Sequence, residues 1–210
     1  MKKIMLAIMT IAGLSATSSA MADEHSWYVS IGIGEATGSG AQTTADQTAT
    51  GGGATGFSSS LSQPTTYKLH VGYQFNKYLA VEGGYIGSNN QNYAATGGNL
   101  AAPATTSIGI NGWNLVAVGI LPVADKFSLL GKVGVSSMQE SMDPLTTAFS
   151  TTGAVTTVTG HKTDVTYGVG AKYDFTDSIF ARVDLDSYNV GNATNANRNT
   201  IWALDVGFKF

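Results

Sequence analysis

The sequence predicts an all-β fold, an eight-stranded antiparallel up-and-down transmembrane β-barrel, and three observations lead to that class. Segments of about ten residues with alternating polarity recur along the chain, and a tilted strand needs this length to cross a bilayer. The connections between these segments alternate between short and long. The last segment, 201–210, ends on an aromatic residue and would leave an unpaired hydrophobic edge unless the sheet closed on itself.

The clearest strand is expected at 65–75, where the large apolar residues Tyr67 and Leu69 alternate with polar residues such as Lys68. A helix is excluded, because the apolar residues do not recur at a spacing of three and four. The same alternation, stronger or weaker, predicts strands at 26–35, 65–75, 78–87, 110–121, 127–138, 163–175, 179–188 and 199–210. The register of 110–121 stays open, because this segment is apolar on both faces.

The connections predict which end of the barrel faces outward. Short turns are expected at 76–77, 122–126 and 176–178, and long outer loops at 36–64, 88–109, 139–162 and 189–198. Short periplasmic turns opposite long outer loops are typical of outer-membrane barrels, and an even strand number places both termini on the periplasmic side. The first long loop consists almost entirely of Gly, Ser, Thr, Ala and Gln, so we expect it to be mobile and poorly ordered.

The first 22 residues are predicted to form a cleaved signal peptide. Two lysines follow Met1, the segment Ile4–Leu14 is apolar, and Ala20-Met21-Ala22 fits a processing site between small residues. The apolar segment is too short for a transmembrane helix. The expected organisation is therefore a signal peptide at 1–22 and an outer-membrane β-barrel at 23–210, in the cell envelope of a Gram-negative bacterium.

Composition argues against several functional classes. Charged residues make up 12% of the chain, the formal net charge is −3, and cysteine is absent. No basic face is available for nucleic acid, and no thiolates are available for disulfides or metal sites. The three histidines are scattered without metal-ligand spacing. We therefore expect no metal, no cofactor and no nucleic-acid partner.

A lipid-modifying outer-membrane enzyme is the least favoured class. Such chemistry needs a nucleophile beside a histidine base that an acid holds in place. His161 with Asp164 is the one combination that merits consideration, but no H-x-S arrangement follows it. His25 lies at the expected mature amino terminus, and His70 projects inward on the predicted strand phase. The sequence therefore predicts that the protein is not an enzyme and has no catalytic residues.

Aromatic residues are expected to form two girdles at the membrane interfaces. Those at the turn end are Trp27, Phe75, Tyr78, Phe127, Phe175 and Phe210, and those at the loop end are Tyr85, Trp113, Tyr188 and Trp202. The soluble alternative is an eight-stranded barrel around a ligand, similar to a lipocalin, which would point its apolar side chains inward. Here the charged face is also the narrow, glycine-rich face, which suits the inside of a small barrel.

Four segments resemble the transmembrane domain of the OmpA-like family of eight-stranded outer-membrane barrels. They are Tyr78–Tyr85, Leu129–Gly134, Ile179–Asp184 and the ending Gly207-Phe208-Lys209-Phe210. The resemblance implies that Gly207, Phe208 and Phe210 form the assembly signal read by the barrel-assembly machinery. It covers the barrel alone, so the peptidoglycan-binding domain of the best-known members and their wall-anchoring role are not carried over.

The resemblance also implies an ionic cluster inside the barrel. In the family an acid at the position of Glu82 pairs with basic residues of neighbouring strands and blocks or gates the lumen. The implied cluster is Glu82, Lys132, Lys172, Arg182 and Asp184. On the predicted strand phases the whole inward set is Lys68, His70, Glu82, Lys132, Asp164, Lys172, Asp174, Arg182, Asp184, Asp186, Asp205 and Lys209, with five positive and six negative residues beside the histidine. Charges in a narrow, partly desolvated lumen are tolerable only when they are paired.

The sequence therefore predicts an integral outer-membrane barrel with a structural or surface-interaction (adhesin-like) role. The alternative is a narrow gated pore for small solutes, in which Glu82 switches between Arg182 and Lys132. The expected partners are outer-membrane lipids and lipopolysaccharide, the barrel-assembly machinery during insertion, and host or phage surfaces through the outer loops.

Overall fold

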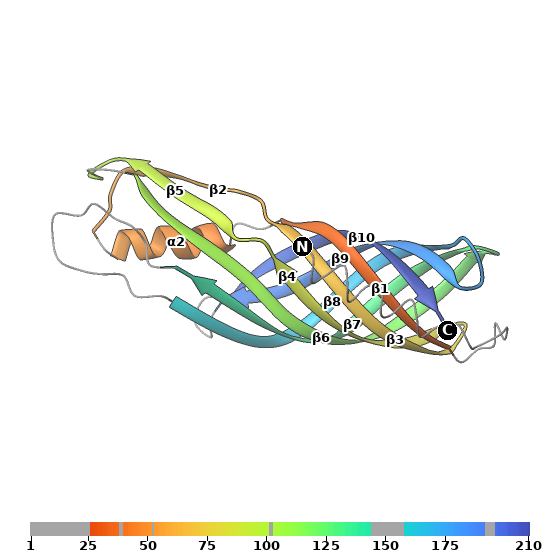
Figure 1. Ribbon diagram of the computed structural model, residues 1–210. Coiled ribbons are helices and arrows are strands. Elements are labelled where there is room, and N and C mark those ends of the chain that lie inside the picture. Colours follow the sequence, from red (N-terminus) through yellow and green to blue (C-terminus); the bar gives the residue numbers. More distant parts are fainter. Residues whose placement is uncertain (1–25, 38–39, 52, 101–102, 144–157, 192–195) are drawn as a thin grey trace.

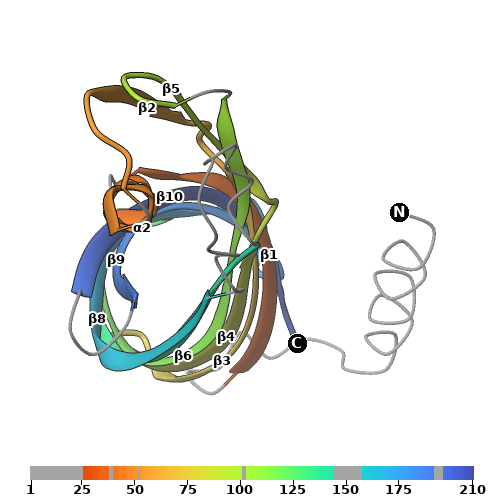
Figure 2. The same ribbon diagram turned by 90° about the vertical axis from the view of Figure 1, so that its left-hand side faces the viewer.

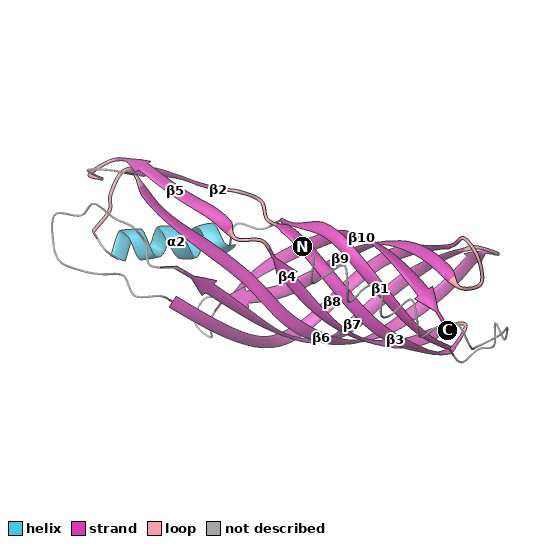
Figure 3. Cartoon of the chain, viewed as in Figure 1, coloured by secondary structure: helices cyan, strands magenta, loops and turns pink. Residues whose placement is uncertain are grey.

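The computed structural model describes residues 26–37, 40–51, 53–100, 103–143, 158–191 and 196–210, and the predicted signal peptide lies outside these ranges. The described residues form a ten-stranded sheet and one helix (Figures 1 and 3). The strands are β1 Ser26–Thr37, β2 Phe57–Leu61, β3 Thr65–Asn76, β4 Leu79–Ser88, β5 Gln91–Gly97, β6 Ala104–Ala124, β7 Phe127–Met142, β8 Val158–Asp174, β9 Ile179–Gly191 and β10 Ala196–Lys209. The helix is α2, Gly40–Gly51.

Eight of these strands close into a barrel, seen end-on in Figure 2. They follow the order β6-β4-β3-β1-β10-β9-β8-β7, every neighbour is antiparallel, and pairing of β6 with β7 completes the ring. Closure also protects the aromatic end of the chain, because Phe210 N–H donates to the Trp27 carbonyl at 2.9 Å. All eight predicted strands are confirmed, and most extend further at the end of the long connections.

The outside of the ring is apolar. Ile33 and Val133 are 62% and 58% exposed, and they belong to a continuous belt of large apolar side chains. A belt of this extent is suited to lipid rather than water, so the soluble, lipocalin-like alternative is wrong. The structure also resolves the open register of 110–121: Leu115 faces outward, whereas Val116 is buried inside.

The aromatic girdles are confirmed with one exception. The six residues assigned to the turn end are all exposed on the outer wall, and at the loop end Tyr85 packs against Trp113 with ring centroids 4.9 Å apart. Tyr188 was assigned to the outer girdle, and this assignment is wrong, because its side chain is 1% exposed and points into the barrel. It shares the strand phase of Asp186, and polar partners inside the barrel satisfy its hydroxyl group.

Two of the long connections are folded rather than irregular. Segment 36–64 contains α2 and β2, and segment 88–109 contains β5 and the first residues of β6. The expectation that 36–64 is poorly ordered throughout is therefore wrong. We call α2, β2, β5 and residues 104–108 of β6 the outer extension. Figure 1 shows it continuing the barrel wall beyond the end that is opposite the short turns.

The outer extension has its own small core. The buried residues of this core are Ala45, Ala49, Ala54, Tyr93, Ala95, Ala104 and Ile108. Alanines four positions apart on α2 share one face of the helix, and their small side chains let it approach the sheet closely. The hydroxyl group of Tyr93 donates to Asp46 Oδ1 at 2.7 Å and ties α2 to β5. Among the described residues, no helix is both long and apolar enough to cross a membrane.

The apolar belt makes a testable prediction about Val133. Placing a charge at mid-depth on the lipid face should lower the free energy of unfolding by about 2–4 kcal/mol. We expect this loss for Val133→Arg, measured by equilibrium denaturant unfolding in lipid vesicles. Thr105→Arg, on the same outward face but in the outer extension, is the control and should cost far less. Equal losses for the two variants would contradict a membrane belt at this level.

Candidate functional site in the barrel interior

The barrel interior holds a buried network of charged side chains. Its members are Lys68, His70, Glu82, Lys132, Arg182, Asp184, Asp186 and Asp205, and each of them is at most 6% exposed. They come from the inward faces of β3, β4, β7, β9 and β10. We call this set the central network. It lies at the middle of the barrel because alternate residues of every strand point into a space that eight strands leave just wide enough to fill.

Arg182 is the centre of the network. Its Nη1 forms a hydrogen-bonded ion pair with Glu82 Oε1, and its Nε lies 3.0 Å from Asp184 Oδ2 and 3.9 Å from Asp205 Oδ2. Its Nη2 lies 3.3 Å from Ser30 Oγ. One guanidinium group therefore connects carboxylates from three strands, which its rigid fork of donors makes favourable.

The lysines complete the pairing. Lys132 Nζ binds Asp184 Oδ2 and lies 3.8 Å from both Glu82 Oε2 and Asp186 Oδ1. Lys68 Nζ donates to Asp186 Oδ2 at 2.6 Å. Each carboxylate of the network therefore lies within ion-pair range of a basic group, which offsets the cost of burial.

Glycines on neighbouring strands make room for three of the aspartates. A Cβ atom added at Gly32 would lie 2.3 Å from Asp205 Oδ1, and one at Gly170 would lie 2.3 Å from Asp184 Oδ1. Gly168 faces Asp186 in the same way, at 2.1 Å. A side chain at any of these positions would collide with a carboxylate, so glycine fits where each acid lies against the neighbouring strand.

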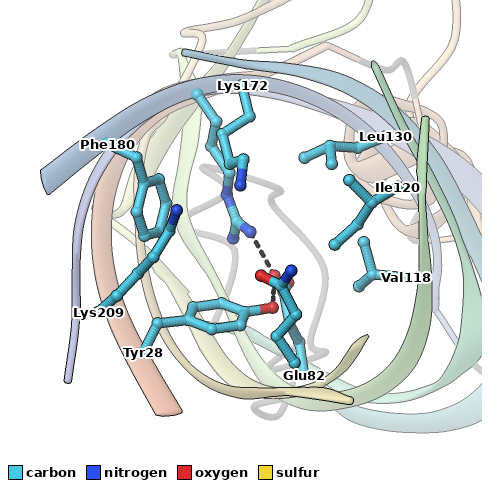
Figure 4. Close-up of a pocket in the computed structure, with 10 residues that line it drawn as sticks. Tyr28, Glu82, Val118, Ile120, Leu130, Lys172, Phe180 and Lys209 are labelled. Atoms are coloured by element: carbon cyan, nitrogen blue, oxygen red, sulfur yellow. Dashed lines mark hydrogen bonds and ion pairs between the residues drawn. The ribbon is translucent and has the colours of Figure 1, made fainter. Parts of the chain in front are cut away.

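A second layer lies below the network, toward the turn end (Figure 4). One side is apolar, formed by Val118, Ile120 and Leu130, and Phe180 lies opposite them beside Lys209. On the other side Asp174 binds Lys209 at 2.6 Å and Lys172 at 3.2 Å. Tyr28 joins the two layers, because its hydroxyl group donates to Glu82 Oε1 at 2.6 Å. The cavity left between these side chains is about 20 Å³, room for about one water molecule.

The structure brings together four of the five residues of the implied cluster. Glu82, Lys132, Arg182 and Asp184 are in mutual contact, whereas Lys172 lies in the turn-end layer with Asp174. The other inward residues also take their predicted places, except that Asp164 lies at the outer mouth, part exposed and bonded to Asn189.

Sequence reasoning missed two tyrosines of the interior, Tyr28 and Tyr188. Tyr188 accepts a hydrogen bond from Asn114 Nδ2 and donates to Asp186 Oδ2, both at 3.3 Å. The phase of each strand could have found them, because Tyr28 alternates with the outward Trp27. The aromatic character of Tyr188 instead pointed to the lipid face, and Tyr28 was not assigned.

The structure also describes the carboxy-terminal ending and the potential metal ligands. Gly207 packs on Phe180, since an added Cβ atom would lie 2.1 Å from its ring, and Phe210 is exposed at the end of the barrel. The assembly role of this ending stays a prediction. In the described part of the chain, no group of three or more potential ligand residues is arranged to hold a metal ion.

Comparison with known proteins identifies the class. The family model described as "Outer membrane protein beta-barrel domain" matches residues 6–210, so the chain belongs to this family. The predicted OmpA-like resemblance and the outer-membrane location are thereby confirmed. No curated protein sequence matches the chain.

Three solved structures illustrate the similarity of fold. Neisserial surface protein A has a TM-score of 0.55 at 14% identity, covering 88% of this chain and 97% of that chain. The outer membrane protein AlkL has a TM-score of 0.53 at 16% identity, with 92% and 94% covered. Ail, the attachment invasion locus protein of Yersinia pestis, has a TM-score of 0.50 at 14% identity, with 90% and 100% covered.

The central network makes a prediction for Arg182→Met. Removing the guanidinium group leaves several buried carboxylates without their main partner, and breaking a buried pair costs about 3–5 kcal/mol. We expect at least this loss in the free energy of unfolding in vesicles. The control is Lys209→Met, whose pair with Asp174 is partly exposed and should contribute about 1 kcal/mol or less. A similar small loss for both variants would show that the network does not stabilise the barrel.

Glu140 makes a prediction about pH. It lies at the outer mouth of β7, beyond the aromatic girdle, and burial there raises the pKa of its carboxyl group. Its Oε1 atom has no hydrogen-bond partner among the described residues. A raised pKa means that the folded chain holds a proton which the unfolded chain loses, so this group lowers stability as the pH rises past the ordinary carboxyl pKa.

We therefore expect Glu140→Gln to stabilise the barrel at neutral pH, with the gain disappearing at acidic pH. The measurement is denaturant unfolding in vesicles across this pH range. Glu35→Gln is the control, because Glu35 is exposed and lies near the outer end of β1. A gain in stability for Glu140→Gln that does not change with pH would show that ionisation of the Glu140 carboxyl group is not its cause.

Proposed function

We propose that this protein is a non-enzymatic outer-membrane barrel with a surface-interaction (adhesin-like) role, for which the barrel is the structural anchor. The observation that carries this proposal is the contrast between the two ends of the molecule. The lumen is filled by paired charges and apolar side chains, whereas the outer end carries a folded extension with a core of its own.

The filled lumen argues against transport as the main role. The cavity below the central network is about 20 Å³, and the cavity above it, beside Tyr188, is about 10 Å³. Between the two, Arg182 and Lys132 connect carboxylates from different strands across the barrel. A solute would have to break several of these buried pairs to pass.

The outer extension supports a role at the cell surface. α2 contacts β2 on one side and the outer ends of β9 and β10 on the other, so it is held at the barrel mouth. A loop that served only as a hydrophilic covering would need no such packing. A preorganised surface loses less entropy on binding than a flexible loop does, which favours recognition of another surface.

The partners follow from this proposal. The apolar belt contacts outer-membrane lipids, with lipopolysaccharide around its outer end. Insertion through the barrel-assembly machinery would use the ending Gly207–Phe210. Host or phage surfaces would be bound through the outer extension and its neighbouring loops.

The surface role predicts the behaviour of Ala49→Arg. Ala49 is fully buried between α2 and the sheet, so arginine should displace the helix and leave the barrel intact. We expect a laboratory bacterium that displays the wild type to adhere to cultured cells more than the same bacterium without it. The Ala49→Arg substitution should abolish this added adherence. Thr50→Arg, which adds the same charge at the next, exposed position, is the control and should retain adherence. Equal adherence of both variants, or none with the wild type, would contradict the proposal.

The narrow gated pore is the second candidate, and the position of Glu82 favours it. Its carboxylate is bonded to Arg182 and lies 3.8 Å from Lys132, so both partners of the predicted switch are within reach. Single-channel recording in a planar bilayer distinguishes the two functions. A silent wild type and a silent Glu82→Ala variant are the result expected for the anchor. Discrete openings that Glu82→Ala enlarges or lengthens would establish the pore.

A further inference from the structure

A polar groove lies on the outer wall of the barrel, separate from both the lumen and the outer extension's core. Its volume is about 200 Å³, ten times that of the larger lumen cavity described above. The lining residues are Tyr67, Tyr85, Ser88, Asn90, Ser107, Gly109, Ile110, Asn111, Ser141 and Asp143. We call it the wall groove.

The groove forms where two strands share one side of β6. β4 pairs with β6 as far as Gly87 opposite Asn111, and β5 takes over from Gln91 opposite Ile108. Between these pairs the side chain of Ser88 replaces a strand partner, because its Oγ accepts from Ile110 N–H at 3.1 Å and donates to the Ile110 carbonyl at 3.2 Å. The gap is therefore a stable part of the fold rather than a frayed edge.

Glycines and tyrosines shape the groove. Gly87 and Gly109 have no side chains to fill it, and a Cβ atom at Gly87 would lie 2.4 Å from Tyr67 Cε2. The ring of Tyr67 therefore lies flat over Gly87. Tyr85 forms the adjoining wall and is itself held by Trp113. Two aromatic rings thus border the groove at fixed positions.

Polar groups without partners line the opposite side. Within the described residues, the side-chain amides of Asn90 and Asn111 and the carboxylate of Asp143 make no hydrogen bond or ion pair. Ser107 and Ser141 add hydroxyl groups next to them. Donors and acceptors therefore stand side by side around one cavity, and every charged group in the lining is a carboxylate.

We propose that the wall groove binds a sugar ring. Tyrosine faces accept the apolar C–H face of a sugar, and amides with a carboxylate both donate to and accept from its hydroxyl groups. A phosphate is disfavoured, since Asp143 would repel it and no lysine or arginine lines the groove. A cationic headgroup would leave the asparagine and serine donors unused. The volume is below the roughly 300–1,000 Å³ of pockets for drug-sized ligands, so it fits one ring of a larger molecule.

The level of the groove indicates where the sugar comes from. Tyr85 and Trp113 belong to the outer aromatic girdle, which marks the interface between lipid tails and headgroups. A sugar at this height can belong to a surrounding glycolipid or to a free saccharide. The proposal does not depend on the adhesin-like role, because the groove opens on the barrel wall at the base of the outer extension and does not involve its core.

The test uses the full barrel, refolded in micelles of a polyoxyethylene detergent, which contains no sugar. Side-chain amide NMR signals of Asn90 and Asn111 report binding at the groove itself. One arm titrates free N-acetylglucosamine, a second adds lipopolysaccharide to the micelles, and a third adds inorganic phosphate. The variants are Asn111→Ala and Asp143→Asn, with Thr105→Ala on the same face of β6 as the matched control, and far-UV circular dichroism verifies folding.

We expect saccharide to shift these amide signals and each groove variant to raise the Kd about tenfold or more, as loss of a hydrogen bond to a charged or bidentate group implies. Thr105→Ala should bind as the wild type does. Shifts with lipopolysaccharide alone would show that the groove binds the sugar of a glycolipid. Shifts in both saccharide arms would show that it also binds the free sugar. Absence of shifts in both saccharide arms, unchanged binding by folded groove variants, or displacement of the sugar by phosphate would each overturn the proposal.

Discussion

Hydrogen bonding of the backbone in lipid is the constraint on which the rest of this structure depends. A strand in the bilayer cannot leave its N–H and C=O groups unpaired, so the sheet has to close through β1–β10 and β6–β7. Closure with eight strands then sets the width of the lumen, and that width forces the inward side chains into contact. The buried charges of the lumen are therefore a consequence of the barrel size, and their pairing is what makes that size tolerable.

The interior network and the glycine pattern solve one packing problem together. Three aspartates point into the lumen, and each is opposite a glycine of the neighbouring strand. Arg182 then lies among the acids, where its planar group can meet several carboxylates at once. Packing and electrostatics thus favour the same arrangement, which fills the centre of the lumen with paired side chains.

The outer surface offers two different kinds of feature. The outer extension is built on alanine packing and one Tyr93–Asp46 bond, and it presents a folded platform beyond the membrane. The wall groove lies where β4 and β5 exchange places along β6, at the level of the aromatic girdle. Both depend on β6 being longer than a bilayer requires, because its outer residues supply one side of each.

The sequence by itself determined the strands, their inward and outward faces and the identity of the buried charges, because alternation with a period of two is a local property of the chain. It did not set the register of 110–121, where both faces are apolar, and it misplaced Tyr188, because the aromatic character of this residue outweighed the strand phase that it shares with Asp186. The sequence also did not predict the helix and strand within 36–64, because the small polar residues of this segment show no hydrophobic periodicity. Only the tertiary structure decided which acid meets which base and where the wall groove lies, because those contacts join residues that are distant in sequence and meet only when the ring closes.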